Sequence, residues 1–358
     1  MHFECFIYSV GEPFEMKMTR IATRAACFRY LRICLATISI YCAASFQASA
    51  ASPSKASPAA QAPVAEGKDG WLFLESELRF LSFPVFWGKQ ALQSARSPKP
   101  EAADPLPAIV DFSRQLAGRG ILLFVVPVPP KAWHGARLPA RALEGLSSDS
   151  LGKFYKLLTA EGVKVIDLRA AFKEREEAGE QMYCKTDSHW SGAGCVAAAV
   201  TVAKALADAG VAVSPSSLPA RWTQARIRGD LLDLKQAPPS EEELLQIRRI
   251  GDAPLQPNPS SSLLVLGDSH TLVFHDFLAE GAGFPDQLAK ETGITPDWIG
   301  TRGSGANAVR VSLLRRALKE PSYLESKKAI VWCFAAREFT ESEQGWQRLP
   351  LTVEKSVK

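Results

Sequence analysis

Short, continuous apolar runs recur along the chain, and they constrain the fold more than any other feature. They lie at residues 121–128, 262–266 and 329–334, with further strand segments expected at 163–168 and 298–300. Unbroken hydrophobicity of this kind is typical of strands covered on both faces, as in a parallel sheet. Segments with helical spacing alternate with them, at residues 106–117, 151–160, 194–207, 271–279 and 306–319. This order predicts an α/β fold with three layers and a mostly parallel central sheet.

The composition excludes several classes of protein. The chain has 358 residues, of which 46% are hydrophobic, and a formal net charge of +4. These are ordinary values for a globular protein, so a collagenous, wholly disordered or multi-spanning membrane protein is excluded. The net charge is too small and too evenly spread to indicate a nucleic-acid partner, and we predict none.

The first 50 residues have the order of an export signal. A basic stretch over 16–32 precedes an apolar run over 33–46, and Ala48-Ser49-Ala50 follows. This order predicts a secretory signal peptide cleaved after Ala50. The alternative is an uncleaved inner-membrane anchor, although the apolar run is short for a bilayer span, which needs about 20 residues. Residues 1–15 lack the pattern, so the true start could be Met16 or Met18.

The rest of the chain divides by composition. Residues 51–66 are rich in Ala, Pro and Ser and predict a flexible linker. We expect one folded domain over 67–345 and a C-terminal tail over 346–358. Residues 215–259 are richer in Pro, Arg and Glu and are expected to form an insertion rather than a core element.

Three cysteines follow the leader, at positions 184, 195 and 333. An exported chain meets oxidising conditions, so Cys184 and Cys195 are a candidate disulfide that would clamp the segment between them. The alternative is that both are small buried thiols, as we expect for Cys333 on its strand.

A strand-turn-helix motif supplies a candidate nucleophile. In SLLVLGDSHT the apolar run over 262–266 enters the turn Gly267-Asp268-Ser269, and a helix is expected to follow. A serine at such a turn lies at the carboxyl end of a strand, where open α/β sheets bind ligands. Its own amide would lie near a helix N-terminus and suit a developing oxyanion. The alternative is an ordinary helix cap.

A second motif, TDSHWS over 186–191, supplies the partners that such a serine needs. A serine nucleophile requires a base, and the base requires a carboxylate on its other ring nitrogen. Asp187 and His189 can supply both from one loop. A zinc site that combines these residues with His270 and His275 is an alternative, but it would not require a serine. We predict no metal and no cofactor.

Taken together, these motifs resemble a known family. The GDS turn resembles the first sequence block of SGNH hydrolases, except that here the Asp-x-His pair precedes the serine. That order resembles the AlgX/AlgJ type of alginate O-acetyltransferase. Five further segments carry the same resemblance, namely DGWLFL (69–74), VPVPPKAW (126–133), YCKTDSHWS (183–191), IRGDLLDL (227–234) and VWCFAARE (331–338).

The resemblance implies a periplasmic enzyme that transfers acetyl groups to hydroxyls of an exopolysaccharide. It implies Ser269 as the nucleophile, His189 as the base and Asp187 as the carboxylate that orients it. A membrane-bound O-acyltransferase would be the acetyl-supplying partner, and the exopolysaccharide would be the acceptor.

Other candidate residues have a structural alternative. Gly303, Gly305 and Asn307 could contribute to an oxyanion site, or could form a glycine-rich turn before a helix. Arg337 could contact an acidic sugar, or could form a salt bridge. Trp190, like other tryptophans of the chain, could stack on a sugar or pack in the core. His134 could line the rim of the cleft.

Three functions fit these motifs. The first is acetyl transfer to a polysaccharide through an acetyl-enzyme. The second is an exported carbohydrate esterase that uses the same triad with water as acceptor. The third is a non-catalytic polysaccharide-binding or assembly protein, against which the intact set of Asp187, His189 and Ser269 argues.

Overall fold

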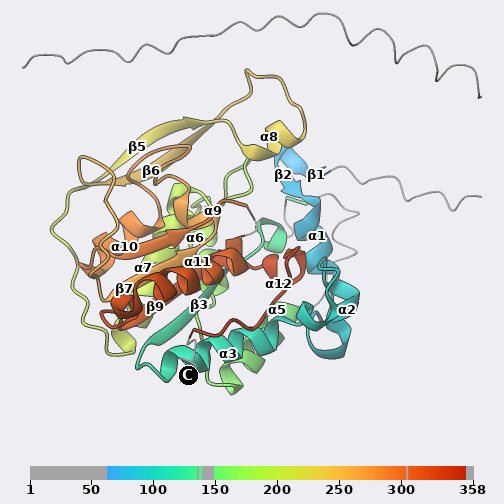
Figure 1. Cartoon of the computed structure of the whole chain (residues 1–358). Helices are drawn as coiled ribbons and strands as arrows, with labels where there is room; N and C mark the ends of the chain where they lie inside the picture. The colour runs from blue at the N-terminus through green and yellow to red at the C-terminus, as the bar shows by residue number, and fades with distance from the viewer. Residues whose placement is uncertain (1–62, 135–136, 139–148, 304, 352–358) are drawn as a thin grey trace, which may run out of the picture. The chain divides into compact units, whose positions relative to one another are not determined.

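The core of the computed structural model is a sheet of five parallel strands in the order β4-β3-β9-β7-β8 (Figure 1). Its strands are β3 (Leu122–Val128), β4 (Lys164–Val165), β7 (Leu263–Gly267), β8 (Asp297–Gly300) and β9 (Ala329–Ala335). Every residue of β7 and β9 is buried, which explains why these segments are apolar without alternation. The predicted α/β class and parallel sheet are confirmed.

The structure describes residues 63–134, 137–138, 149–303 and 305–351, which fall within one compact unit, residues 58–358. The predicted signal peptide and residues 51–62 of the predicted linker lie outside the described residues. Within the described part of the chain, none of the helices combines the length and apolar character that a membrane span requires.

Helices cover both faces of the sheet. Because β-α-β crossovers are right-handed, connections that run in opposite directions along the sheet lie on opposite faces. One face therefore carries α3 (Pro105–Ala117), α5 (Ser150–Ala160) and α11 (Gly305–Lys319), and the other carries α7 (Gly192–Asp208) and α10 (Phe284–Thr292), which pack against each other. The helix α6 (Arg169–Glu177) packs against α7. The predicted three layers are present.

The segments singled out in the sequence meet at the carboxyl edge of this sheet. Lys131 follows β3, Ser269 follows β7, and Arg337 follows β9. Carboxyl ends of parallel strands share one edge, so residues far apart in the sequence become neighbours there. The short helices α9 (Ser269–Leu272) and α12 (Glu338–Glu341) begin at this edge.

The expected insertion at residues 215–259 is an ordered part of the domain. It forms an antiparallel hairpin of β5 (Ala220–Ile227) and β6 (Glu243–Ile250), with α8 (Asp230–Leu234) between the strands. The inward face of the hairpin buries Ile227, Leu245 and Ile247 in the main core, and β6 contacts α7. The hairpin therefore carries α8 against the rest of the domain (Figure 1).

Secondary structure and buried residues extend a few residues beyond the expected domain at both ends. The strand β1 (Val64–Glu66) lies within the predicted linker and pairs with β2 (Leu72–Leu74), which leads into α1 (Glu75–Ser82) and then α2 (Ala91–Ser94). At the other end, Trp346 and Leu351 lie in the predicted tail but are buried in the core. The pairing of β1 with β2 and the burial of Trp346 extend the fold at its two ends. Amino-acid composition predicts neither of them.

Two predicted elements are shorter than expected. The helix expected over 271–279 ends at Leu272, because the chain turns through positive φ at Phe274 and Leu278 and forms a bridge between Val273 and Phe277. The strand expected over 163–168 is reduced to Lys164–Val165, and the amide of Ile166 makes one more hydrogen bond to β3, at Val125, before α6 begins.

Candidate active site

Ser269 stands at the start of α9, directly beyond the buried strand β7, as the sequence predicted. The preceding residue, Asp268, caps this helix, since its Oδ1 accepts a hydrogen bond from the amide of His270 at 2.9 Å. Its other oxygen accepts from the amide of Ala335 at the end of β9, at 2.6 Å. The fully buried Asp268 therefore fixes the turn to the neighbouring strand, and the side chain of Ser269 remains partly exposed.

Two glycines allow the chain to pack tightly around this turn. A Cβ atom at Gly267 would lie 2.0 Å from Cγ2 of Thr271, and one at Gly305 would lie 2.8 Å from Cα of Asp268. Gly305 therefore lets the start of α11 lie against the backbone of the serine turn. Within the described residues, the amide N–H of Ser269 donates no hydrogen bond.

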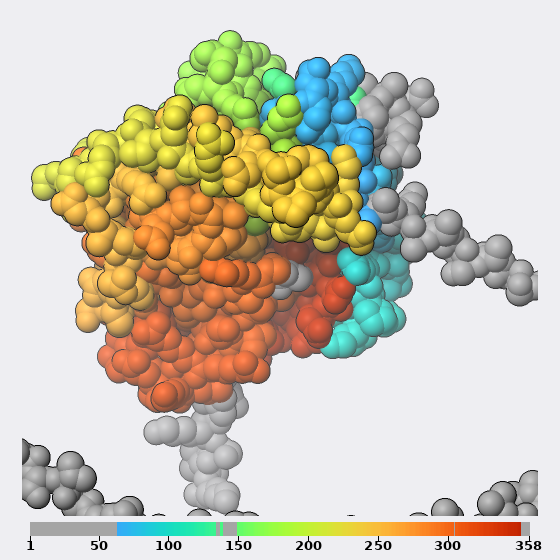
Figure 2. All heavy atoms as spheres, turned by 90° about the horizontal axis from the view of Figure 1, so that it is seen from above, coloured from blue at the N-terminus to red at the C-terminus, as the bar shows by residue number. Residues whose placement is uncertain are grey.

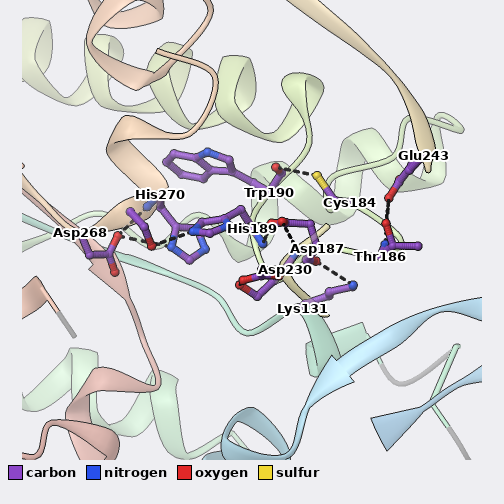
Figure 3. Close-up of polar contacts among 12 residues, drawn as sticks. Lys131, Cys184, Thr186, Asp187, His189, Trp190, Asp230, Glu243, Asp268 and His270 are labelled. Atoms are coloured by element: carbon purple, nitrogen blue, oxygen red, sulfur yellow. Dashed lines mark hydrogen bonds and ion pairs between the residues drawn. The ribbon is translucent and has the colours of Figure 1, made fainter. Parts of the chain in front are cut away.

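Ser269, His189 and Asp187 form a continuous hydrogen-bonded chain. Figure 3 shows His189 and Asp187 in this chain. The Oγ of Ser269 lies 2.7 Å from Nε2 of His189, and Nδ1 of His189 lies 2.6 Å from Oδ1 of Asp187. A carboxylate only accepts hydrogen bonds, so Nδ1 carries the proton and Nε2 presents its lone pair to the serine hydroxyl. The amide of His189 also donates to Oδ1 of Asp187, at 2.9 Å.

The electrostatics of this pair suit a base with an ionised partner. Burial by itself would raise the pKa of Asp187, but the charge of His189 and hydrogen bonds from His189 and the amide of Asp230 hold that pKa well below its usual range. Burial by itself would lower the pKa of His189, but the charge of Asp187 and its hydrogen bond outweigh it and raise that pKa. Asp187 is thus ionised at neutral pH and stabilises the imidazolium form of His189.

The imidazole of His270 packs against that of His189 but is not part of the hydrogen-bonded chain to Ser269. The ring centroid of His270 lies 4.7 Å from that of His189, and its Nδ1 lies 3.3 Å from Oδ1 of Asp268. Burial lowers the pKa of His270 to about 4, so this ring is neutral at neutral pH. His270 is thus a buried, uncharged neighbour of the base.

The described residues contain one group of three potential metal-ligating side chains, Asp187, His189 and Asp230, whose ligand atoms lie within 4.8 Å of one another. Both oxygens of Asp187 accept N–H groups, and both oxygens of Asp230 accept from Ser188. His189 directs its remaining nitrogen at Ser269. A hydrogen-bonded set of this kind fits proton transfer, whereas a metal would have to displace these donors.

Trp190 is not a sugar-stacking surface. The expectation that it could contact substrate is wrong, because its side chain is fully buried and packs edge-on against His270 and beside Phe284. It supports the two histidines from within the core. The side chain of His134, expected at the rim, lies outside what the structure describes.

Arg337 forms an ion pair that is largely buried. Its Nη1 lies 3.2 Å from Oε1 of Glu77, and its side chain is 16% exposed. Although burial alone would lower the pKa of this guanidinium, Glu77 and Glu338, and then Asp268 and Asp230, keep it raised. Of the two roles considered for Arg337, the salt bridge is present, and it links α1 to the carboxyl edge of the sheet.

The three candidate residues around the start of α11, Gly303, Gly305 and Asn307, have different environments. Gly303 has a positive φ of 83° and open space around its Cα, as a turn residue would. Asn307 is buried, and its amide is engaged on both sides: Nδ2 donates to Oγ of Ser342, and Oδ1 accepts from Arg310. Gly305 packs against the backbone of the serine turn, whereas the amide of Asn307 is already hydrogen-bonded elsewhere, so we do not assign Asn307 as an oxyanion donor.

The predicted disulfide between Cys184 and Cys195 is wrong. Both are buried free thiols, as is Cys333, for which this was expected. The Sγ of Cys184 donates to the carbonyl oxygen of Trp190 at 3.3 Å, whereas that of Cys195 lies 3.8 Å from the carbonyl oxygen of Ala282. Cys184 and Cys195 face different carbonyl groups, so no disulfide clamps the segment between them.

We expect all three thiols to be alkylated when the protein is unfolded without a reductant. Burial raises the pKa of each thiol well above its usual value, which keeps it protonated and unreactive in the folded state. Mass spectrometry of the unreduced, alkylated protein checks this. A peptide pair joined through positions 184 and 195 would contradict it.

Polar groups from three other segments hold the loop that carries Asp187 and His189. The Nζ of Lys131 donates to the carbonyl oxygens of Lys185 and Asp187 at 2.9 and 3.0 Å. Glu243, at the start of β6, accepts from the amides of Lys185 and Thr186. Asp230, at the start of α8, accepts from Ser188 and donates its amide to Asp187.

Sequence reasoning missed these three residues, although two lie in segments already noted. Lys131 lies in VPVPPKAW and Asp230 in IRGDLLDL, and both segments were used only for the family resemblance. The glycine before Asp230 was the available signal, since an isolated glycine beside a polar residue often marks a close backbone approach.

The surface is hollowed at this end of the molecule. Figure 2 shows the hollow between the gold residues around α8, the orange residues that follow α9, and the red residues around α12. Phe277, in the orange segment, lies edge-on to His189 with ring centroids 5.9 Å apart. The guanidinium of Arg302 lies over the Phe277 ring, 4.3 Å from its centroid, and pairs with Asp276.

Known proteins are similar to this domain in sequence and in fold. The sequence profile of the family described as "SGNH hydrolase-like domain, acetyltransferase AlgX" matches residues 64–294. A curated relative, the probable alginate O-acetylase AlgJ of Pseudomonas aeruginosa, is 28% identical over 193 residues. That match spans 51% of this chain and 43% of the relative, so the chain spans less than half the length of that protein.

Two solved structures have the same fold. The O-acetyltransferase domain of Pseudomonas putida AlgJ superposes with a TM-score of 0.58 and 20% identity, covering 78% of this chain and 93% of that one. Pseudomonas aeruginosa AlgX superposes with a TM-score of 0.53 and 18% identity, covering 76% of this chain and 61% of that one. The family profile spans well over half of the sequence, and the chain therefore belongs to the AlgX family of SGNH hydrolase-like acetyltransferase domains.

Proposed function

We propose that this protein is an O-acetyltransferase that modifies an exopolysaccharide through an acetyl group carried on Ser269. The observation that carries the proposal is the chain of contacts from Oγ of Ser269 through His189 to Asp187, with distances of 2.7 and 2.6 Å. A nucleophile, its base and an orienting carboxylate in this arrangement perform acyl transfer on several unrelated folds. Family membership supports acetyl as the acyl group.

In the first half of the reaction, Nε2 of His189 takes the hydroxyl proton of Ser269 as Oγ attacks the acetyl carbon of the donor. The amide N–H of Ser269, free of described partners, is available to the oxyanion. As the tetrahedral intermediate collapses, the donor alcohol leaves and takes the proton from His189. The acetyl group is then an ester of Ser269.

In the second half, a sugar hydroxyl gives its proton to Nε2 of His189 and attacks the acetyl-serine ester. Oγ of Ser269 leaves and recovers the proton, which restores the free enzyme. Asp187 stays ionised throughout and stabilises the imidazolium that forms in each half, in keeping with the direction of both pKa shifts.

The cellular setting is part of the proposal. The export signal expected in the first 50 residues supports a periplasmic location, where exopolysaccharide is accessible. A membrane-bound O-acyltransferase is the proposed acetyl supplier, and a uronic-acid-containing or similar polymer the proposed acceptor. The same three residues would also serve an esterase, for which water replaces the sugar hydroxyl.

Decay of the acetyl-enzyme distinguishes the transferase from the esterase. We expect Ser269 acetylated from an activated acetyl ester to hydrolyse slowly, and acceptor oligosaccharides to speed its decay and become acetylated. Oriented binding of a sugar hydroxyl gives it a high effective concentration at the ester, whereas an esterase needs no such binding. Rapid quenching and mass spectrometry measure both the acetyl-enzyme and the product. Equal decay with and without a panel of oligosaccharides, and no acetylated sugar, would support the esterase instead.

A further inference from the structure

The segment Gly229-Asp230 lies close to the backbone of the loop that carries Asp187 and His189. A Cβ atom at Gly229 would lie 2.1 Å from the carbonyl oxygen of Thr186 and 2.7 Å from the amide nitrogen of Asp187. Those neighbours are backbone atoms and cannot rotate away. Only glycine therefore lets the start of α8 lie directly against the loop.

At this contact, Asp230 bonds to the loop at two points. Its amide donates to Oδ2 of Asp187 at 2.9 Å, which is the oxygen that His189 does not use. Its carboxylate accepts from the amide of Ser188 at 2.7 Å and from the hydroxyl of Ser188 at 2.5 Å. Asp230 thus anchors Ser188, the residue between the carboxylate and the base, and Figure 3 shows Asp230 beside Asp187.

We infer that Asp230 is a positioning residue for the catalytic pair: it fixes the second oxygen of Asp187 and the backbone at Ser188, and it places a second negative charge beside His189. The inference rests on the proposed function only for the name of the reaction, because the contacts with Asp187 and His189 exist whatever the acyl acceptor is. It also gives the inserted hairpin a role, since β5, α8 and β6 deliver Asp230 to the site.

The effect of the Asp230 charge on His189 can be measured by titrating His189. Burial and the charge of Asp187 raise the pKa of Asp230 itself. In its ionised form the carboxylate of Asp230 favours the charged imidazolium, in addition to the larger contribution from Asp187. The other charged or titratable groups beside this imidazole are Asp268 and His270, after β7. Lys131, after β3, acts on Asp187, and Arg337, after β9, acts on Asp230 and Asp268. A substitution that removes only the charge of Asp230 leaves all of them in place.

The test is Asp230→Asn, which keeps the backbone amide and the size of the side chain. The side-chain oxygen of asparagine still accepts from the amide of Ser188, so the loop stays anchored. Loss of the nearby negative charge should lower the pKa of His189. The neutral base then persists to lower pH, so the acid limb of the kcat/KM profile should shift by the same amount in the same direction.

Asp233→Asn is the matched control on the same helix. This side chain is 66% exposed and pairs with Arg228, which also donates to three backbone carbonyls. We expect it to leave both the His189 titration and the pH profile unchanged. Asp230→Ala, which also loses the contacts with Ser188, should lower kcat further than Asp230→Asn with little change in KM.

Two measurements separate this inference from the proposed function. Imidazole NMR follows the titration of His189 without any acetyl donor, and hydrolysis of an activated acetyl ester gives the pH profile. A lowered His189 pKa in Asp230→Asn, without acetyl transfer to sugar, would sustain the inference and reject the transferase. An unchanged His189 pKa and an unmoved acid limb in folded Asp230→Asn would overturn the inference even if acetyl transfer is normal.

Discussion

Replacing Ser269 with alanine is expected to reduce acetyl transfer and ester hydrolysis by on the order of 10³-fold or more, a loss of about 4 kcal/mol of transition-state stabilisation. The reason is that Oγ is the atom that Nε2 of His189 faces at 2.7 Å, and the substitution removes it. Steady-state kinetics with an activated acetyl ester, with and without oligosaccharide, measure both activities.

The variant should fold normally, because the Ser269 side chain is partly exposed and no backbone group depends on it. Circular dichroism and thermal unfolding check this. Ser217→Ala is the matched control, since that serine is exposed and lies in the segment before β5. Near-normal activity in folded Ser269→Ala would reject the mechanism, as would an equal loss in Ser217→Ala.

His189→Ala should cause a loss of similar size, and the double variant with Ser269→Ala should be scarcely worse than either single variant. The two groups act as a unit, because the base has no function without the hydroxyl whose proton it takes. A double-mutant cycle on kcat gives the coupling between them. If the loss in the double variant equals the product of the two single losses, the two residues act independently and the 2.7 Å contact between them does not contribute to catalysis.

The sequence predicted most of the sheet and four of the helices that cover it, α3, α5, α7 and α11, but not the packing of the hairpin β5–β6. Strands β3, β7 and β9 are buried on both faces, so continuous apolar runs reveal them. The hairpin β5–β6 has one exposed face, on which Trp222 is 50% and Leu244 53% exposed, and its polar composition suggested an insertion without core contacts. Its burial depends on packing against α7, which local pattern does not report.

The catalytic candidates could be predicted because each lies in a short motif with its own chemistry. Asp187 and His189 are two residues apart, and Ser269 stands in a strand-turn-helix motif. Asp230 could not be predicted in the same way, because it lies 43 positions after Asp187 and contacts it through a backbone amide. The disulfide expectation failed for a related reason: sequence proximity of two cysteines says nothing about where their Sγ atoms point.

The measurement that tests the central claim most directly is the location of the acetyl group during turnover. Wild-type protein is mixed with an activated acetyl ester, quenched in acid and digested, and its peptides are analysed by mass spectrometry. The mechanism predicts one acetyl group on Ser269 that forms and decays at rates sufficient to account for turnover, and none at this position in His189→Ala. Turnover without an acetylated Ser269, or acetylation at another residue with matching kinetics, would contradict it.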